Sequence, residues 1–113
     1  MLDKAKVYYL CGPMTGFKNR NYPVFNAEAK RLRELGFTII NPADLHPLSN
    51  SSTYEDEDYK ALRKDLSIIL SSVDGILVMP GWEFSYGCNA EVSVAKAVKI
   101  PIYNIELTVG DSK

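Results

Sequence analysis

The chain has 113 residues, which is enough for one domain with a single core, and we expect that domain to span residues 1–113. Its content of 46% hydrophobic and 24% charged residues is typical of an ordinary soluble globular protein. The net charge of −1 argues against broad binding to polymeric nucleic acid or to a membrane surface, although it leaves room for one small phosphate pocket.

The first predicted strand covers residues 7–11 (Val-Tyr-Tyr-Leu-Cys), a compact apolar run. The loop that follows, Gly12–Gly16, contains glycines that allow a ligand to approach the backbone closely. It lacks both the Gly-Lys-Ser/Thr ending of a Walker A loop and the G-x-G-x-x-G spacing of dinucleotide-binding proteins. From the residues alone, a tight structural turn and a ligand-binding loop are both open.

A helix is predicted between Asn21 and Gly36, because Asn21 and Pro23 are typical of a helix start and Gly36 of a helix end. Its apolar face is formed by Phe25, Ala29, Leu32 and Leu35. Residues 37–40 are predicted as the second strand, so this strand–helix–strand unit indicates a right-handed parallel crossover.

The next segment, Asn41–Thr53, is rich in Pro, Ser and Asn, and we interpret it as a loop. It contains the only histidine, His46. We expect His46 to be solvated rather than catalytic, because a lone histidine in a loop usually is.

The second predicted helix covers about 54–71, with an apolar stripe of Tyr59, Leu62, Leu66, Ile69 and Leu70. Asp65 falls near the edge of that stripe. Its pattern favours a surface acid paired with Arg63 or Lys64, but a role in a site at the helix edge stays open.

The third strand is predicted over 75–79, the third helix over 86–99 and the fourth strand over 102–105, with Pro101 ending the helix. The predicted stripe of this helix consists of Ala90, Val94, Ala97 and Val98. The alternation predicts an α/β fold: a small doubly wound, flavodoxin-like parallel sheet in strand order 2-1-3-4, with helices on both faces.

Two further expectations concern the chain as a whole. Val92 and Ala95 lie outside the stripe of the third helix, more apolar surface than one packed face requires, which predicts a homodimer or higher homo-oligomer. Cys11 and Cys88 lie in or beside predicted buried elements without metal-type spacing, so we expect reduced core residues, no metal and no cofactor. Without a recognisable signal peptide or membrane span, the default location is the cytoplasm.

The candidate site lies where the predicted strands end, because ligands bind at the carboxyl edge of open α/β sheets. Each residue there also has a simpler interpretation: Ser85 as a helix cap, Glu91 as a charge near a helix N-terminus, and Trp82 as a rim residue of the core. Together with Tyr9 and Asp65, however, they combine two carboxylates with hydroxyl groups beside a glycine loop. That combination suits cleavage of a glycosidic bond, which needs a nucleophile and a proton donor.

Three motifs carry a resemblance that covers nearly the whole chain. These are YLCGPMTG at residues 9–16, Asp65-Leu66 eight residues before Val73-Asp74, and S-Y-G-C-N-A-E at residues 85–91. They resemble the nucleoside 2-deoxyribosyltransferase superfamily, especially its small phage- and bacterium-borne domains of unassigned function. The Ser85-x-Gly87-x-x-x-Glu91 pattern is similar to the 2′-deoxynucleoside 5′-monophosphate N-glycosidase branch, since the transferases proper usually carry an aspartate at the position of Ser85.

The resemblance implies a role for each matching residue. Glu91 matches the carboxylate that attacks C1′ of the deoxyribose, Asp65 the carboxylate that positions the sugar and protonates the leaving base, and Tyr9 the tyrosine that orients the nucleophile. The residues that match the lining of the sugar and phosphate pocket are Gly12, Pro13, Met14, Gly16, Trp82, Ser85 and Gly87. The implied ligand is a deoxynucleoside or deoxynucleotide.

The chain departs from the superfamily pattern in two places. Thr15 occupies the position of an arginine in the glycosidase branch, so phosphate binding would need Arg20 or Lys18. Superfamily members also complete their site with C-terminal residues of a neighbouring subunit. Here that contribution is either missing or comes from another segment, for which Asn41–Thr53 is the candidate.

The sequence therefore predicts an enzyme that cleaves or transfers the N-glycosidic bond of a deoxynucleoside or its monophosphate. The alternative is a nucleotide-binding sensor with the same pocket and no turnover. A flavodoxin-like electron carrier is disfavoured, because the loop after the first strand lacks a hydroxyl-rich phosphate cradle.

Overall fold

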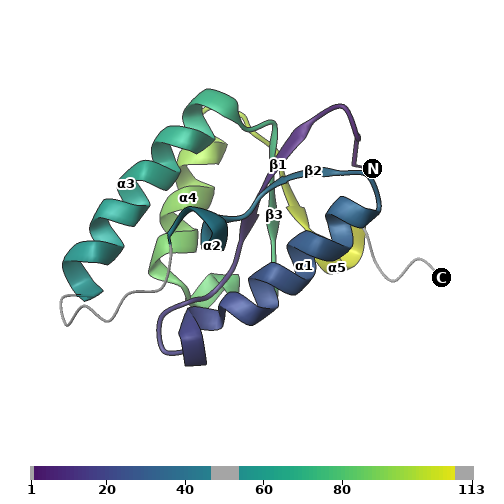
Figure 1. Cartoon of the computed structure of the whole chain (residues 1–113). Helices are drawn as coiled ribbons and strands as arrows, with labels where there is room; N and C mark the ends of the chain where they lie inside the picture. Colours follow the sequence, from purple (N-terminus) through teal and green to yellow (C-terminus); the bar gives the residue numbers. More distant parts are fainter. Residues whose placement is uncertain (1, 47–53, 109–113) are drawn as a thin grey trace.

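The core of the fold is a four-stranded sheet, seen in a computed structural model that describes residues 2–46 and 54–108. In chain order the strands are β1 (Val7–Cys11), β2 (Thr38–Ile40), β3 (Gly75–Val78) and β4 (Ile102–Asn104). In space they are ordered β2-β1-β3-β4, and each neighbouring pair is parallel (Figure 1). The predicted α/β class and strand order are confirmed.

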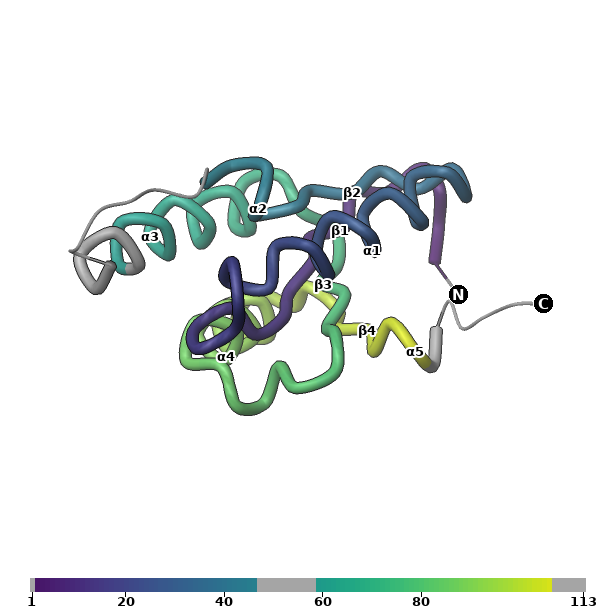
Figure 2. The backbone as a smooth tube through the Cα atoms, turned by 60° about the horizontal axis from the view of Figure 1, so that its bottom comes forward, coloured from purple at the N-terminus to yellow at the C-terminus, as the bar shows by residue number. Residues whose placement is uncertain are grey.

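Helices cover both faces of this sheet. They are α1 (Tyr22–Glu34), α2 (Pro42–Leu45), α3 (Tyr54–Ser72), α4 (Tyr86–Ala97) and α5 (Ile105–Thr108), with the 3-10 turns η1 (Lys18–Asn21) and η2 (Trp82–Phe84). One apolar cluster joins the sheet to α1 and α5, and a second joins it to α3 and α4 (Figure 1). Figure 2 shows the same separation from another direction, with α3 and α5 at opposite ends of the molecule. Within the two described ranges, no helix is long and apolar enough to cross a membrane.

Alternate residues of β1 point to opposite faces of the sheet, as the two-residue period of a strand requires. Tyr8 and Leu10 pack in the cluster with α1, whereas Tyr9 and Cys11 pack in the cluster with α3 and α4. All four are nearly inaccessible to solvent. The register of β1 thus sends one tyrosine and one cysteine to the side of the sheet that α4 covers.

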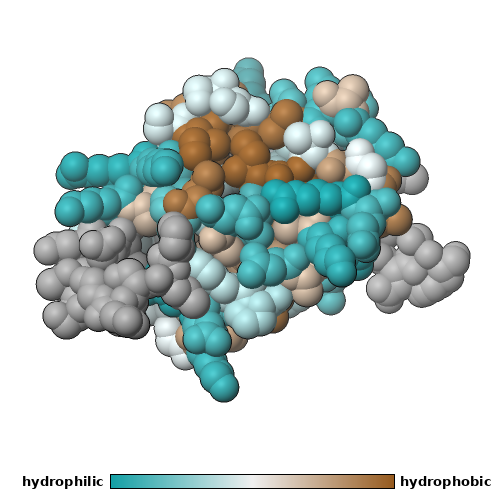
Figure 3. Space-filling model, viewed as in Figure 1, coloured by the Kyte–Doolittle hydropathy of each residue, from teal (hydrophilic) through white to brown (hydrophobic). Residues whose placement is uncertain are grey.

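The buried face of α3 differs from the predicted stripe. Asp65 and Ile69 are buried, but Tyr59 and Leu70 are 51% and 55% exposed. The face toward the sheet runs through Asp65 and Ile69 and continues to Val73, a four-residue spacing that a stripe chosen on hydrophobicity alone does not detect. As a consequence, apolar side chains gather on the surface over the C-terminal half of α3 (Figure 3).

The predicted stripe of α4 is also wrong. The helix buries Cys88, Glu91, Val92 and Ala95, while Val98 is half exposed. Val92 and Ala95 are therefore not surplus apolar surface at a subunit interface, because both pack in the core of their own chain. The expected homo-oligomer loses this support and stays a prediction.

The short helix α2 lies in the segment that was predicted as a loop. The Asn41 side chain accepts a hydrogen bond from the backbone N–H of Ala43 at 3.1 Å, and Pro42 occupies the first helical position. This Asn-Pro pair is a helix-start signal, and it overturns the prediction of a loop at residues 41–45. Residues 47–53 of the same segment lie outside the described residues.

The last predicted strand ends one residue early. Ile105 begins α5 instead of ending β4, because the Asn104 side chain accepts a hydrogen bond from the backbone N–H of Glu106 at 2.9 Å and turns the chain. Ile105 is buried in the cluster with α1 and so anchors this end of the fold.

Candidate active site

A pocket of about 600 Å³ opens at the carboxyl end of β1. Its walls come from β1, the loop that follows, α1, α2, α3 and the first turns of α4. In the order β2-β1-β3-β4, the chain leaves β1 in one direction and β3 in the other, so the pocket lies at the switch point where open α/β sheets bind ligands. The pocket is thus where the sequence places the site.

Glu91 is the carboxylate at the centre of this pocket. The Ser85 side chain caps α4 by accepting a hydrogen bond from the backbone N–H of Cys88 at 3.2 Å, and Glu91 follows in the second turn with only 6% exposure. The Tyr9 hydroxyl donates to Glu91 Oε2 at 2.7 Å, and the Cys11 thiol donates to Glu91 Oε1 at 3.1 Å. Both oxygens of the carboxylate therefore have a donor on β1.

Burial dominates the titration of Glu91. The pKa of Glu91 is raised to about 7, and removal from water is the main cause; the nearby charge of Asp65 adds to the rise, while the hydrogen bonds from Tyr9 and Cys11 oppose it. The carboxylate thus changes charge close to neutral pH. Such a perturbed acid in a pocket is typical of functional sites.

Asp65 faces the same pocket from α3 and is paired with His46. His46 Nε2 lies 2.7 Å from Asp65 Oδ1, and the two side chains are 20% and 9% exposed. Burial raises the pKa of Asp65, while hydrogen bonding to His46 and Tyr9 opposes that rise. The interpretation of Asp65 as a surface acid paired with Arg63 or Lys64 is therefore wrong.

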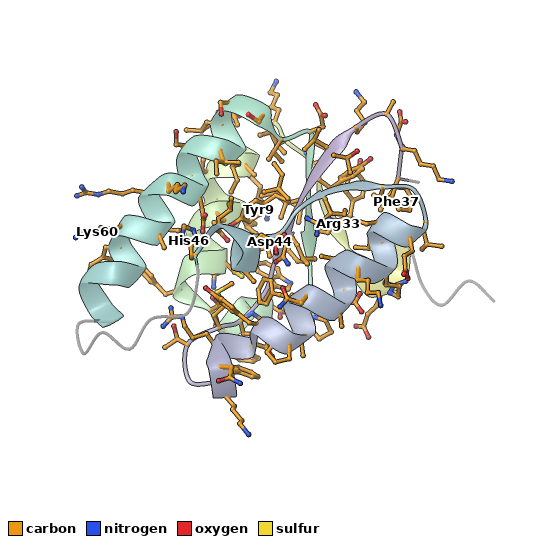
Figure 4. All side chains as sticks on the ribbon, viewed as in Figure 1. Tyr9, Arg33, Phe37, Asp44, His46 and Lys60 are labelled. Atoms are coloured by element: carbon orange, nitrogen blue, oxygen red, sulfur yellow. The ribbon has the colours of Figure 1, made fainter. Side chains whose placement is uncertain are left out.

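The expectation that His46 is solvated is also wrong. His46 ends α2, and its backbone carbonyl accepts a hydrogen bond from the Tyr22 hydroxyl. Figure 4 shows His46 and Tyr9 in the space between α3 and the sheet. The segment Asn41–Thr53, named as the possible source of a missing site residue, thus contributes His46 to the pocket.

Tyr9 lies between the two acids. Burial raises the pKa of Tyr9 well above its usual value, and the charges of Glu91 and Asp65 raise it further. Its hydroxyl consequently stays protonated and acts as a donor to the Glu91 carboxylate. The geometry expected from the sequence, with Tyr9, Asp65 and Glu91 around one pocket, is what the structure shows.

The other predicted pocket residues divide into two groups. Those that line the pocket are Gly12, Met14, Ser85 and Gly87. At Gly12 a Cβ would come within 2.6 Å of the Met79 side chain, whereas at Gly87 it would meet open space. A side chain at Gly12 would therefore require the terminal methyl group of Met79 to shift.

Pro13, Gly16 and Trp82 lie outside the pocket lining, contrary to the expectation. The carbonyl of Pro13 accepts a hydrogen bond from the Asn21 side chain at 2.9 Å, Gly16 supplies a turn with φ of 88°, and Trp82 packs against the core cluster on the α4 side. These three residues shape the surrounding loops.

A strained turn brings Arg20 to the pocket wall. Asn19, Arg20 and Asn21 are three consecutive residues other than glycine with left-handed backbone angles, at φ of 50°, 54° and 63°. Asparagine tolerates this conformation, but for arginine it is uncommon. Backbone strain of this kind persists where the surrounding structure enforces it, often beside a ligand site. Of the two cations expected to be available for phosphate binding, Arg20 and Lys18, only Arg20 lines the pocket.

Cys11 and Cys88 are free, buried cysteines, as predicted. Their sulfur atoms and a Glu91 oxygen lie within 4.8 Å of one another, a spacing that thiophilic metal ions can bridge. Among residues 2–46 and 59–106, whose side chains the structure describes, every buried side-chain nitrogen and oxygen nevertheless has a hydrogen-bond partner. The Glu91 oxygens are therefore satisfied without an ion.

The sequence of the chain matches a known protein family. A family model described as "Domain of unknown function (DUF4406)" matches residues 6–104. The chain belongs to this family. The DUF4406 match spans β1 to β4 and so includes all three residues of the Tyr9–Asp65–Glu91 group. No curated protein matches the chain.

Proposed function

We propose that this DUF4406 domain cleaves or transfers the N-glycosidic bond of a 2′-deoxynucleoside or its 5′-monophosphate. The observation that carries the proposal is a buried carboxylate, Glu91, which is held through both oxygens and faces a pocket that it shares with a second carboxylate, Asp65. A glycosyl-transfer site needs a nucleophile and a proton donor on one sugar. The resemblance to the nucleoside 2-deoxyribosyltransferase superfamily supports the same assignment.

In the proposed reaction, a Glu91 oxygen forms an ester bond to C1′ as the bond between C1′ and the base nitrogen breaks. The electron pair of that bond goes to the base, and Asp65 supplies the proton that neutralises it. Burial raises the pKa of Asp65 from its usual value, which is the direction that a proton donor at this position requires. Water or a second base then attacks C1′, releases Glu91 and leaves one proton to return to Asp65.

The alternative is a sensor that binds nucleotides without turnover. A pure binding site gains little from a buried acid whose pKa is raised to about 7, since ionising it in the core costs free energy. The test is incubation with a panel of deoxynucleosides and their monophosphates, with and without an acceptor base, followed by chromatography. Release or exchange of the base supports the enzyme, and binding without any free base supports the sensor.

Arg20 provides a prediction about the substrate. We expect Arg20→Gln to raise KM for a deoxynucleoside 5′-monophosphate by about tenfold or more, because a charge-assisted bond to phosphate is lost. KM for the matching nucleoside should change little. Arg20 already has an interaction partner in the folded chain, which a phosphate would replace.

The matched control is Lys18→Gln, which removes a nearby cation outside the pocket lining. It should leave KM for both substrates near the wild-type values. If Arg20→Gln raised KM for the nucleoside and for the nucleotide to the same degree, Arg20 would stabilise the loop and would not bind a phosphate group.

We also propose that the chain acts as a homodimer or larger, with helices near the active site at the interface. Support comes from the resemblance and from large apolar side chains left exposed, among them Leu70 on α3 and Tyr86 on α4. The expected result is a dimeric or higher mass by light scattering at tens of micromolar, roughly the range of a moderate interface. A monomeric mass there would contradict this assembly.

A further inference from the structure

We propose that Cys11 is a positioning residue whose thiol sets the orientation and the charge of the Glu91 carboxylate. This inference rests on the proposed function of Glu91 as the nucleophile. It goes further because it assigns a role to a side chain that neither the motifs nor the family match singles out.

The geometry gives Cys11 and Tyr9 complementary tasks. Tyr9 donates to Oε2 of Glu91 at 2.7 Å, and Cys11 donates to Oε1 at 3.1 Å. The two donors are two residues apart on β1, a buried central strand that pairs with both β2 and β3. Because each oxygen is held from the same rigid strand, the plane of the carboxylate is fixed before substrate arrives.

The chemistry of a thiol suits the oxygen that reacts. A thiol is a weak hydrogen-bond donor, whereas a hydroxyl bound to a carboxylate forms a strong, charge-assisted bond. Tyr9 therefore carries most of the stabilisation of the negative charge on Oε2. Cys11 orients Oε1 and leaves its electron pairs available, which makes Oε1 the attacking oxygen.

Titratable groups face Glu91 from each element that packs around it. They are Tyr9 and Cys11 on β1, Asp65 on α3 with His46 behind it, and Cys88 on α4 itself. Burial raises the pKa of Cys11 well above its usual value, so the thiol keeps its proton and remains a donor. Among these groups, Tyr9 and Cys11 are the ones whose hydrogen bonds lower the pKa of Glu91.

The test compares alanine and serine at position 11 in the full chain without substrate. Cys11→Ala removes the donor, so the pKa of Glu91, measured by NMR titration of carboxyl-labelled glutamate, should rise by roughly 0.5–1 unit, the equivalent of one net hydrogen bond. Cys11→Ser keeps a donor, so the pKa should stay at or below the wild-type value. The control Cys88→Ala removes a neighbouring buried thiol that is not among the groups that shift the pKa of Glu91, so it should leave that pKa near the wild-type value.

Kinetics on an active substrate provide the second measurement. The acid limb of the kcat/KM profile should move to higher pH in Cys11→Ala and not in Cys11→Ser, because attack requires ionised Glu91. At high pH, where Glu91 is ionised in every variant, Cys11→Ser should have a lower kcat than the wild type. The reason is that a hydroxyl is a stronger donor than a thiol and makes the electron pairs of the attacking oxygen less available.

Two results would overturn the inference. One is an unchanged Glu91 pKa in folded Cys11→Ala, and the other is an equal shift in the alanine and serine variants, which would indicate packing alone. The NMR titration needs no turnover, so a failure of the proposed reaction would leave this measurement intact and be recognised separately.

Discussion

Glu91→Gln is expected to lower turnover by about a thousandfold or more while substrate binding persists. Glutamine keeps the size of the side chain and can accept the Tyr9 hydrogen bond, but it has no anionic oxygen to attack C1′. The loss should fall on kcat, because the missing interaction forms only as the bond to the sugar forms. Steady-state kinetics and calorimetric binding on the same protein would measure both quantities.

The matched control for this variant is Glu83→Gln. Glu83 is an exposed acid on η2 outside the pocket lining, so the identical chemical change there should leave kcat and KM near the wild-type values. Near-normal turnover in Glu91→Gln would show that Glu91 is only a charge in α4, and the nucleophilic mechanism would be wrong even though the fold is right.

Glu91→Gln should also stabilise the protein at neutral and alkaline pH. The pKa of Glu91 is raised from 4.5 to about 7 on folding, so between these values the folded state holds a proton that the unfolded state has released. Stability therefore falls as pH rises through this interval and is level above it. Ionising the buried carboxylate lowers the free energy of unfolding by at most about 3 kcal/mol. Glu91→Gln has no carboxylate to ionise, so this cost is absent in the variant.

Chemical denaturation at pH values of about 5 and about 8 would measure this effect. The wild type should lose more stability between the two pH values than Glu91→Gln, and the variant should be the more stable protein at the higher pH. Glu83→Gln should behave like the wild type. Equal pH dependence in wild type and Glu91→Gln would contradict a raised pKa for Glu91.

Much of the fold is predictable because the strands and turns carry local signals. The apolar run at 75–79 and the sheet order follow from alternation and short connections, and the structure confirms them. The buried faces of α3 and α4 are not predictable in the same way. A polar residue such as Asp65 lowers the apparent hydrophobicity of the face that turns toward the sheet, so the stripe is assigned to the wrong side.

The residues of the candidate site also differ in how far they can be predicted from the sequence. Glu91 and Tyr9 follow from a carboxylate and a hydroxyl near the predicted carboxyl edge of the sheet, and Asp65 is added to them by the resemblance at its position. His46 does not, because its contact with Asp65 depends on the tertiary arrangement of α2 against α3. Cys11 is missed for a related reason, since a thiol in an apolar strand has no sequence feature that distinguishes packing from a hydrogen bond to Glu91.

The most direct test of the proposed function is detection of the glycosyl-enzyme ester. Intact-protein mass spectrometry of chain quenched in acid during turnover, preferably with a 2′-fluorinated substrate that slows breakdown of the ester, should show an added mass of one sugar or sugar phosphate. Peptide mapping should place that mass on Glu91 and find none in Glu91→Gln. Base release by the wild type with no adduct, or with an adduct on another residue, would contradict the account.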